Sequence, residues 1–263
     1  MIKIKKILIA SLVLIGASAY SMPINTIKNK PEAGSFCHDY GKYGYPGTSD
    51  YYLCRDGYAV AYNCTTKQPN YVVYELTSSS VSRRVKRHDD FEADTSIPSS
   101  CRSNLSDYKK SGYDRGHLAP YASMDFTKHS AEQSFLLSNM SPQKAGLNRQ
   151  GWAKLESYVR YWSKMKGQLY VYTGPIFKGK TNKTIGKDKV AVPVAFYKVL
   201  YAPKQNQTIA FVMPNKKVKK SYKAISDSRV SIAEVEKRTG LKFFSNLSKY
   251  QINKVSKMWK IYR

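Results

Sequence analysis

A helical repeat between Asn148 and Lys166 constrains the fold of this chain more than any other segment. Positions i, i+4 and i+8 of a helix lie on one face, so Asn148, Trp152 and Glu156 are predicted to share one side. A neutral oxygen donor and a carboxylate would then point the same way. Gly167 follows as a stop signal, after apolar residues that recur at helical spacing: Trp152, Leu155, Val159, Trp162 and Met165.

Segments with the pattern of strands flank this helix. Residues 58–63 and 71–76 are β-branched and aromatic with a polar turn between them, which predicts a hairpin. Ser231 and Glu234 form a capping box before a helix that closes at Gly240. Together these patterns predict one α+β domain with a largely antiparallel sheet. The remaining elements expected are strands at 134–137, 169–172, 190–200 and 208–213, a loop at 31–57 and a final helix within 249–263.

The N-terminus has the order of a secretory signal peptide. Lysines precede an apolar run, and Ala17-Ser18-Ala19 offers a small-residue cleavage site. An uncleaved anchor is the alternative, but Ser21 and Pro23 dilute the apolar stretch below what a spanning helix needs. We therefore expect an exported protein, secreted or periplasmic, with no stable membrane association after cleavage. The expected parts are the signal peptide at 1–19, an N-terminal loop region with cysteines at 20–57, and the main domain with a basic C-terminal tail at 58–263.

The cysteines fit an oxidising compartment. There are four of them, Cys37, Cys54, Cys64 and Cys101, all after the expected cleavage site. An even number in an exported chain predicts two disulfides, in one of three pairings. A zinc site is the competing interpretation, but the sequence has no Cys-x-x-Cys pair and no paired histidines to support it.

The charge balance points to a polyanionic partner. Lys and Arg number 44 against 18 Asp and Glu, a formal net charge of +26. Neutralising phosphates releases counterions and gives affinity that does not depend on sequence. A generally basic, solvated surface would produce the same balance. The 22 tyrosines offer stacking platforms for bases, although half-buried filling of strands accounts for them more simply.

The tetrapeptide Asp114-Arg115-Gly116-His117 carries the chemistry. Neutral imidazole accepts a proton from water near pH 7–8, so His117 suits a general base. Asp114 or a nearby amide would fix its tautomer. Arg115 offers a bidentate fork for a phosphate and for the charge that grows in a transition state. We assign no role to the other three histidines.

Asn148 and Glu156 suit a hard cation. Mg2+ keeps most of its waters and needs few protein oxygens, so one amide oxygen with a substrate phosphate would hold it. Glu156 would grip a coordinated water from two turns away. Taken alone, the two residues would be read as a helix cap and a solvated carboxylate, and their combination with His117 is what favours a metal site.

Three motifs resemble those of the DNA/RNA non-specific endonuclease family. They are DRGHLAP at 114–120, SNMSPQ at 138–143 and NRQGWAKLE at 148–156, with Tyr172-Thr-Gly-Pro175 later. The resemblance runs in order from about Tyr58 to Asn215. It implies a ββα-metal unit, in which two strands supply the histidine and a helix supplies the metal ligand.

The resemblance also implies roles for single residues. His117 corresponds to the general base, Asn148 to the direct Mg2+ ligand and Glu156 to the residue that holds metal-bound water. Arg115 corresponds to a phosphate-stabilising arginine. Asn139 matches a second asparagine near the site, positional and not metal-ligating, and we expect it among the substrate-binding residues.

An upstream arginine completes the expected site. Arg87 has the spacing of a family residue that contacts substrate, although Arg83 and Arg84 are close enough to leave the register open. The cysteines and the basic C-terminal tail lie outside the motif set.

The predicted function is a secreted Mg2+-dependent endonuclease acting on DNA and RNA without sequence preference, with Mn2+ or another divalent cation able to substitute. Water activated by His117 would attack phosphorus, and the resemblance implies products that end in 5′-phosphate. The alternative is a non-catalytic nucleic-acid-binding protein on the same fold. A basic phosphate-binding or cell-wall-associated structural protein is a third interpretation, for which the charge alone would suffice.

Overall fold

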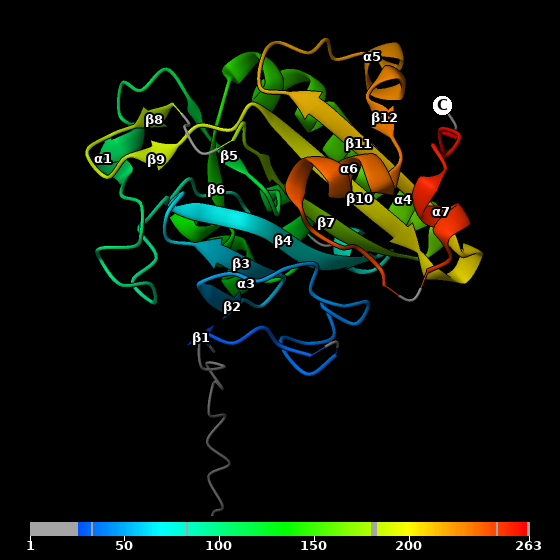
Figure 1. The fold of residues 1–263 in the computed structure, drawn as a ribbon, viewed down its shortest axis with the longest axis horizontal. Coiled ribbons are helices and arrows are strands. Elements are labelled where there is room, and N and C mark those ends of the chain that lie inside the picture. Colours follow the sequence, from blue (N-terminus) through cyan, green and yellow to red (C-terminus); the bar gives the residue numbers. More distant parts are fainter. Residues whose placement is uncertain (1–25, 33, 83, 180–182, 246, 262–263) are drawn as a thin grey trace, which may run out of the picture.

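A large antiparallel sheet forms the centre of the protein (Figure 1). The computed structural model describes residues 26–32, 34–82, 84–179, 183–245 and 247–261. All neighbouring strands of this sheet pair antiparallel. In spatial order they are β1 (Thr26–Ile27), β2 (Tyr51–Cys54), β3 (Ala59–Asn63), β4 (Gln68–Thr77), β7 (Gln168–Ile176), β10 (Ala195–Ala202), β11 (Gln207–Pro214) and β12 (Arg229–Val230).

Both faces of the sheet are buried, which follows from the alternation of side chains along each strand. In β4, Val72 and Tyr74 belong to one hydrophobic core, while Tyr71 and Val73 belong to a second core on the opposite face. Helix α4 (Ala153–Lys166) packs into the first core and α6 (Ile232–Thr239) into the second. Most strand tyrosines are fully buried, so they fill the cores as expected.

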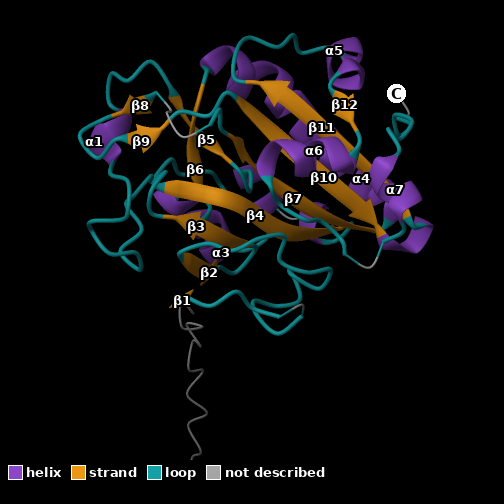
Figure 2. Cartoon of the chain, viewed as in Figure 1, coloured by secondary structure: helices purple, strands orange, loops and turns teal. Residues whose placement is uncertain are grey.

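Shorter strands and helices complete the fold (Figure 2). Two small sheets stand apart from the central one, β5 (Asp114–His117) with β6 (Met140–Gln143) and β8 (Thr184–Ile185) with β9 (Val190–Ala191). Among the described residues no helix is long and apolar enough to cross a membrane. The other helices are α1 (Leu105–Tyr108), α2 (Tyr121–Met124), α3 (Lys128–Gln133), α5 (Tyr222–Asp227), α7 (Lys249–Asn253), the 3-10 turns η1 (Ser80–Ser82), η2 (Leu137–Asn139) and η4 (Pro203–Gln205), and the π-helical turn η3 (Leu147–Trp152).

Most expected elements are confirmed. The hairpin corresponds to β3 and β4, the strands at 169–172 and 208–213 to β7 and β11, and the capped helix to α6. Ser231 Oγ accepts a hydrogen bond from Glu234 N at 3.1 Å, and Gly240 closes the helix with φ +73°. The α+β class and the largely antiparallel sheet are confirmed as well.

Four local predictions were wrong. The strand expected at 134–137 lies later, as β6, because Ser134 ends α3 and Leu137 opens a 3-10 turn. The strand expected at 190–200 is broken between β9 and β10, where Pro193 has no N–H to donate. Within the loop expected at 31–57, β2 joins the central sheet. The final helix covers only α7, and 254–261 is not helical.

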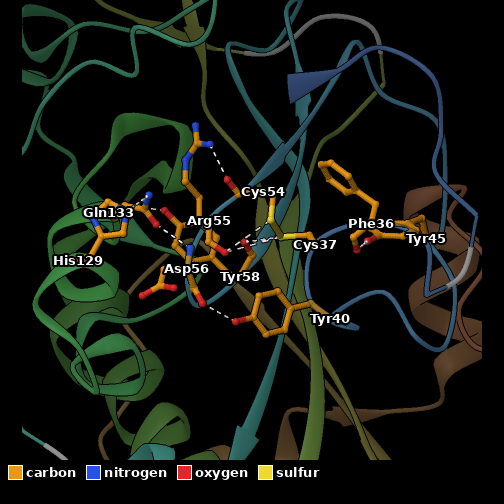
Figure 3. Close-up of a disulfide and its surroundings, with 10 residues drawn as sticks. All are labelled: Phe36, Cys37, Tyr40, Tyr45, Cys54, Arg55, Asp56, Tyr58, His129 and Gln133. Atoms are coloured by element: carbon orange, nitrogen blue, oxygen red, sulfur yellow. Dashed lines mark hydrogen bonds between the residues drawn. A yellow bond between two sulfur atoms is a disulfide. The ribbon is translucent and has the colours of Figure 1, made fainter. Parts of the chain in front are cut away.

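Two disulfides are confirmed, and the structure selects one of the three pairings. Cys37 joins Cys54, and Cys64 joins Cys101. The first bond fastens the N-terminal loop to the end of β2, beside the buried Arg55 (Figure 3). Neither bond reaches past residue 101, so no disulfide constrains the rest of the chain.

Removing the disulfide that closes the longer loop is expected to lower the free energy of unfolding more than removing the other disulfide. The Cys64–Cys101 bond closes 37 residues and the Cys37–Cys54 bond closes 17. Chain entropy then gives losses of about 4 kcal/mol for Cys64→Ala with Cys101→Ala and about 3 kcal/mol for Cys37→Ala with Cys54→Ala. Urea unfolding of the two double variants and the parent protein measures both values. A larger loss for the shorter loop would contradict this ordering.

Candidate active site

One cleft of about 970 Å³ gathers most of the predicted site residues. The strand β5, the turn η3 and the helix α4 form its walls, together with helix α1 and the segments at 87–91 and 109–113. His117, Arg115, Asn148, Glu156 and Arg87 all line it, although they span 70 positions of sequence. The chain brings these five residues together as predicted.

The pairing of β5 with β6 presents His117 at the cleft. His117 lies opposite Met140, and Gly116 lies opposite Ser141. A Cβ on Gly116 would stand 2.4 Å from Gln143 Oε1, so only glycine allows this close approach. Two strands followed by η3 and α4 form the expected ββα unit.

Asn139 lies beneath the cleft and does not line it. The residue is fully buried. Its Oδ1 accepts a hydrogen bond from Ala119 N at 2.9 Å, and its Nδ2 donates to Ala119 O and Ser134 O, each at 2.8 Å. Both polar atoms are therefore used within the protein. The structure therefore corrects the expected substrate contact. Asn139 instead holds the chain just after His117 in position.

His117 is an unusual imidazole, because it is packed between rings and lacks a hydrogen-bond partner at one nitrogen. Its ring lies 5.6 Å from that of Phe91 and 5.2 Å from that of Phe135. Nε2 is buried and bonds to no described group. Burial, followed by the nearby guanidinium groups of Arg87 and Arg115, lowers the pKa of His117 to about 3. The imidazole is therefore neutral at physiological pH.

A π-helical turn presents Asn148 to the cleft. In η3 the chain is wider than an α-helix, which changes the face on which each side chain lies. Asn148 and Glu156 both line the cleft, but Trp152 between them is fully buried in the first core. The prediction that all three share one face was wrong for Trp152. The Gly151 N–H donates to Val218 O at 3.1 Å, and a Cβ there would stand 2.6 Å from the Val218 side chain.

The Asp114 carboxylate connects β5 to η3. Its Oδ2 accepts a hydrogen bond from Asn148 Nδ2 at 2.9 Å, and Arg149 binds both carboxylate oxygens, at 2.9 and 2.7 Å. Although partial burial raises it, the hydrogen bonds from Arg149 and Asn148 leave the pKa of Asp114 below its ordinary value. Asp114 therefore orients Asn148 and makes no hydrogen bond to His117, so of the two groups expected to fix the His117 tautomer, Asp114 or a nearby amide, the carboxylate does not do so.

The cations of the cleft lie on aromatic rings. The Arg115 guanidinium lies 4.1 Å from the centre of the Phe91 ring, and no described residue forms an ion pair with it. Arg87 lies over the rings of Tyr121 and Phe135 and pairs with Asp89 at 2.7 Å. Both side chains are exposed.

The structure narrows the choice among the three upstream arginines that the sequence offered, Arg83, Arg84 and Arg87. Arg84 points to Asp125, 3.1 Å away, and does not line the cleft, whereas Arg87 does. Arg83 lies outside the described residues.

Two basic residues near Glu156, one lining the cleft and one buried, were not predicted. Arg160 lines the cleft one turn after Glu156, and its buried Nη1 bonds to no described group. Lys198 is fully buried; its Nζ lies 3.4 Å from Leu118 O, 3.2 Å from Thr173 Oγ1 and 4.6 Å from the Trp152 ring centre.

Their charges are coupled to Glu156. Burial lowers the pKa of Lys198 to about 8, against the attraction of Glu156, while burial raises the pKa of Glu156 against the attraction of Lys198 and Arg160. A lysine within the apolar run of 195–202, and an arginine at i+4 from Glu156, were the available sequence signals.

The His117 imidazole is expected to remain neutral well below the pKa of a free histidine. The folded protein binds a proton at His117 more weakly than the unfolded chain, in which a histidine titrates near pH 6.5. The free energy of unfolding therefore falls as the pH is lowered from about 6.5 toward 3. Two-dimensional NMR of the ring protons measures the titration, with the urea-unfolded chain as control. A folded-state midpoint at or above 6.5 would show that burial does not govern this group.

Comparison with known proteins agrees with this geometry. The family model for DNA/RNA non-specific endonucleases matches residues 38–250. Nuclease C1 of Cunninghamella echinulata var. echinulata is 37% identical over 221 residues, covering 78% of this chain and 87% of that protein. Human mitochondrial endonuclease G is 34% identical over 219 residues, covering 78% and 73%. The crystal structure of a complex of EndoG with EndoGI superposes with a TM-score of 0.75 at 34% identity, covering 80% and 92%.

The prediction of export is wrong on this comparison. The related nucleases of Schizosaccharomyces pombe, Saccharomyces cerevisiae, cattle, zebrafish and human are mitochondrial by name. The signal-peptide pattern at 1–19, on which a secreted or periplasmic location rested, lies outside the described residues.

The match spans most of the chain, and the relatives exceed 30% identity over more than two thirds of their own length. The chain therefore belongs to the DNA/RNA non-specific endonuclease family, whose members hydrolyse phosphodiester bonds, on a ββα-metal nuclease fold.

Proposed function

We propose that the protein is a Mg2+-dependent endonuclease that cuts DNA and RNA without sequence preference and leaves 5′-phosphate ends. The observation that carries the proposal is the convergence of His117, Asn148, Glu156 and Arg115 on one cleft of a chain from this family. Mn2+ or another divalent cation is expected to replace Mg2+. Binding alone requires none of these four residues, which disfavours the non-catalytic alternative. The third interpretation, a structural protein, leaves the site unexplained.

The residues of the cleft fit a hard cation with few protein ligands. Asp114 binds the amide nitrogen of Asn148, and no described residue donates to the amide oxygen, which is left facing the cleft as a neutral ligand. Among the described residues no group of three or more His, Cys, Asp or Glu side chains is arranged for a metal. A cation held by Asn148, with Glu156 bonded to its hydration waters, is therefore the arrangement that these side chains support. When bound, the cation supplies Lewis-acid stabilisation of charge on the phosphate oxygens.

His117 is suited to accept the proton of the attacking water. It is neutral at physiological pH, and its ring lines the cleft. The water oxygen bonds to phosphorus, the 3′ oxygen leaves, and the proton moves to the imidazole. Because external water attacks, the reaction requires no 2′-hydroxyl, and both DNA and RNA qualify as substrates.

Arginines of the cleft are suited to bind the phosphates. Arg115 lies on a ring, and no described residue pairs with its donors, so they suit bidentate contact with a phosphate. Arg87 lies over the rings of Phe135 and Tyr121 and fits an adjacent phosphate. Asn139 supports the site from below through Ala119 and makes no contact with substrate.

His117→Ala is expected to reduce cutting of supercoiled plasmid and of RNA by about 10²- to 10⁴-fold, because general-base catalysis contributes that much. Asn148→Ala is expected to abolish cation-dependent cutting. Gel assays with Mg2+ or with EDTA measure both effects. His88→Ala is the matched control, since His88 is exposed and outside the cleft, and it should retain full activity.

The outcomes separate the parts of the proposal. Intact plasmid and RNA after incubation of the parent protein with Mg2+ would rule out the enzyme. Equal cutting by the parent and His117→Ala would rule out the assigned base, and unchanged cutting in EDTA would rule out the cation.

Activity is expected to fall steeply with salt. The two phosphate contacts assigned to Arg115 and Arg87 would reduce substrate affinity roughly 12-fold between about 50 and about 200 mM NaCl. Measuring kcat/KM across this range at constant Mg2+ checks the slope, with an equivalent osmolarity of sucrose as the control. A flat response would remove the phosphate contacts from the mechanism.

A further inference from the structure

A second groove, of about 650 Å³, lies between the C-terminal end of α4 and the C-terminal segment. Trp162, Met165 and Lys166 contribute from α4, residues 205–208 from the turn between β10 and β11, and residues 250–260 from α7 and beyond. Figure 1 shows α7 and the C-terminus beside α4, at the end of the molecule away from β5 and β8.

The groove combines positive charge with aromatic rings. Four lysines line it and no acidic residue does: Lys166, Lys254, Lys257 and Lys260. The Lys166 ammonium lies 4.4 Å from the Trp259 ring centre and that of Lys254 lies 5.0 Å from Tyr250. Tyr250 is 70% exposed, unlike the buried tyrosines of the sheet. An exposed ring among lysines suits an unstacked base and its neighbouring phosphates.

The C-terminal segment that forms one wall is held in place by specific bonds. Trp162 Nε1 donates to Lys260 O at 3.2 Å, and Arg229 Nη1 donates to Ser256 O at 2.9 Å. Gln251 Nε2 donates to Asn206 Oδ1 at 2.7 Å. The lysines beyond α7 therefore stand at fixed positions along the groove.

Helix α4 connects this groove to the cleft. Glu156 lines the cleft and Lys166 lines the groove, ten residues later on the same helix. Ten residues of helix measure about 15 Å. A nucleic-acid strand has one phosphate per about 3.4 Å of duplex axis, so about five nucleotides cover that distance.

The match to the family model ends at residue 250, so the wall formed by 251–260 lies beyond the matched region. Most of the lysines of the groove therefore lie outside the region that the family model matches, separate from the motifs of the catalytic cleft.

We infer that this groove binds a single-stranded segment of the substrate, about five nucleotides away from the bond that is cut. The lysines contact the phosphates, and Tyr250 stacks on an unpaired base. This inference rests on the proposed nuclease function, because it takes the same molecule to occupy both the cleft and the groove.

Matched charge variants test the inference. The groove variant carries Lys254→Gln, Lys257→Gln and Lys260→Gln, and the control carries three other exposed lysines changed alike, Lys30→Gln, Lys42→Gln and Lys237→Gln. Both are made on His117→Ala so that the probe stays intact. Fluorescence anisotropy measures the Kd of a labelled 24-nucleotide single strand and of a labelled tetranucleotide at several salt concentrations.

The groove variant is expected to bind the 24-mer about tenfold more weakly than the control variant, with a slope of log Kd against log salt smaller by up to about 2, or about 0.7 per lost phosphate contact. Binding of the tetranucleotide should not change. Equal 24-mer affinities in the two variants would overturn the inference. An equal loss for the tetranucleotide would also overturn it, because the effect would then belong to the cleft.

Stacking is tested by one further pair. Tyr250→Ala should weaken binding of the 24-mer about fivefold, whereas Tyr250→Phe should retain it, because the ring and not the hydroxyl stacks. Unchanged binding by Tyr250→Ala would overturn the stacking contact. Failure of the parent protein to cut nucleic acid would refute the proposed function. If the parent protein cuts, equal binding of the 24-mer by the groove variant and the control variant would refute this inference alone.

Discussion

The site depends on one carboxylate, Asp114, which joins the two halves of the ββα unit. It lies three residues before His117 on β5 and bonds to Asn148 and Arg149 on η3. The proposed base and the proposed metal ligand are therefore held in one hydrogen-bonded frame, although 30 residues separate them in sequence. Because Arg149 is exposed, this ion pair contributes little to stability by itself. Its importance is geometric, since it turns the amide oxygen of Asn148 toward the cleft.

The electrostatics of the cleft arise from burial as much as from charge pairing. His117 stays neutral because rings surround it and two arginines stand nearby. Beneath it, Lys198 bonds to the carbonyl of Leu118, so a buried cation supports the residue next to the proposed base. A protonated imidazole would add a further positive charge to this group. The arrangement therefore favours a base over an acid at this position.

The sequence predicted the members of the site better than their geometry. Motif spacing identified His117, Arg115, Asn148 and Glu156, because these residue types are required by the chemistry and stand in a recognisable order. It could not foresee the burial of Asn139, since exposure depends on packing by distant segments such as β3 and β4. Lys198 was missed for the same reason: only the fold brings that residue of β10 to the carbonyl of Leu118. Strands were predicted where β-branched residues alternate, and prediction failed at Pro193 and at Ser134, where local turns interrupt the pattern.

The π-helical turn at Leu147–Trp152 has a consequence for anyone who projects this chain on a helical wheel. One additional residue within a turn rotates everything after it by about 100° relative to a continuous α-helix. Residues before and after Ala153 therefore follow two different wheels. If the additional residue were absent, Asn148 and Glu156 would stand seven positions apart on a regular α-helix, only about 20° from each other around its axis. The π-helical turn thus determines which residues before and after Ala153 line the cleft together.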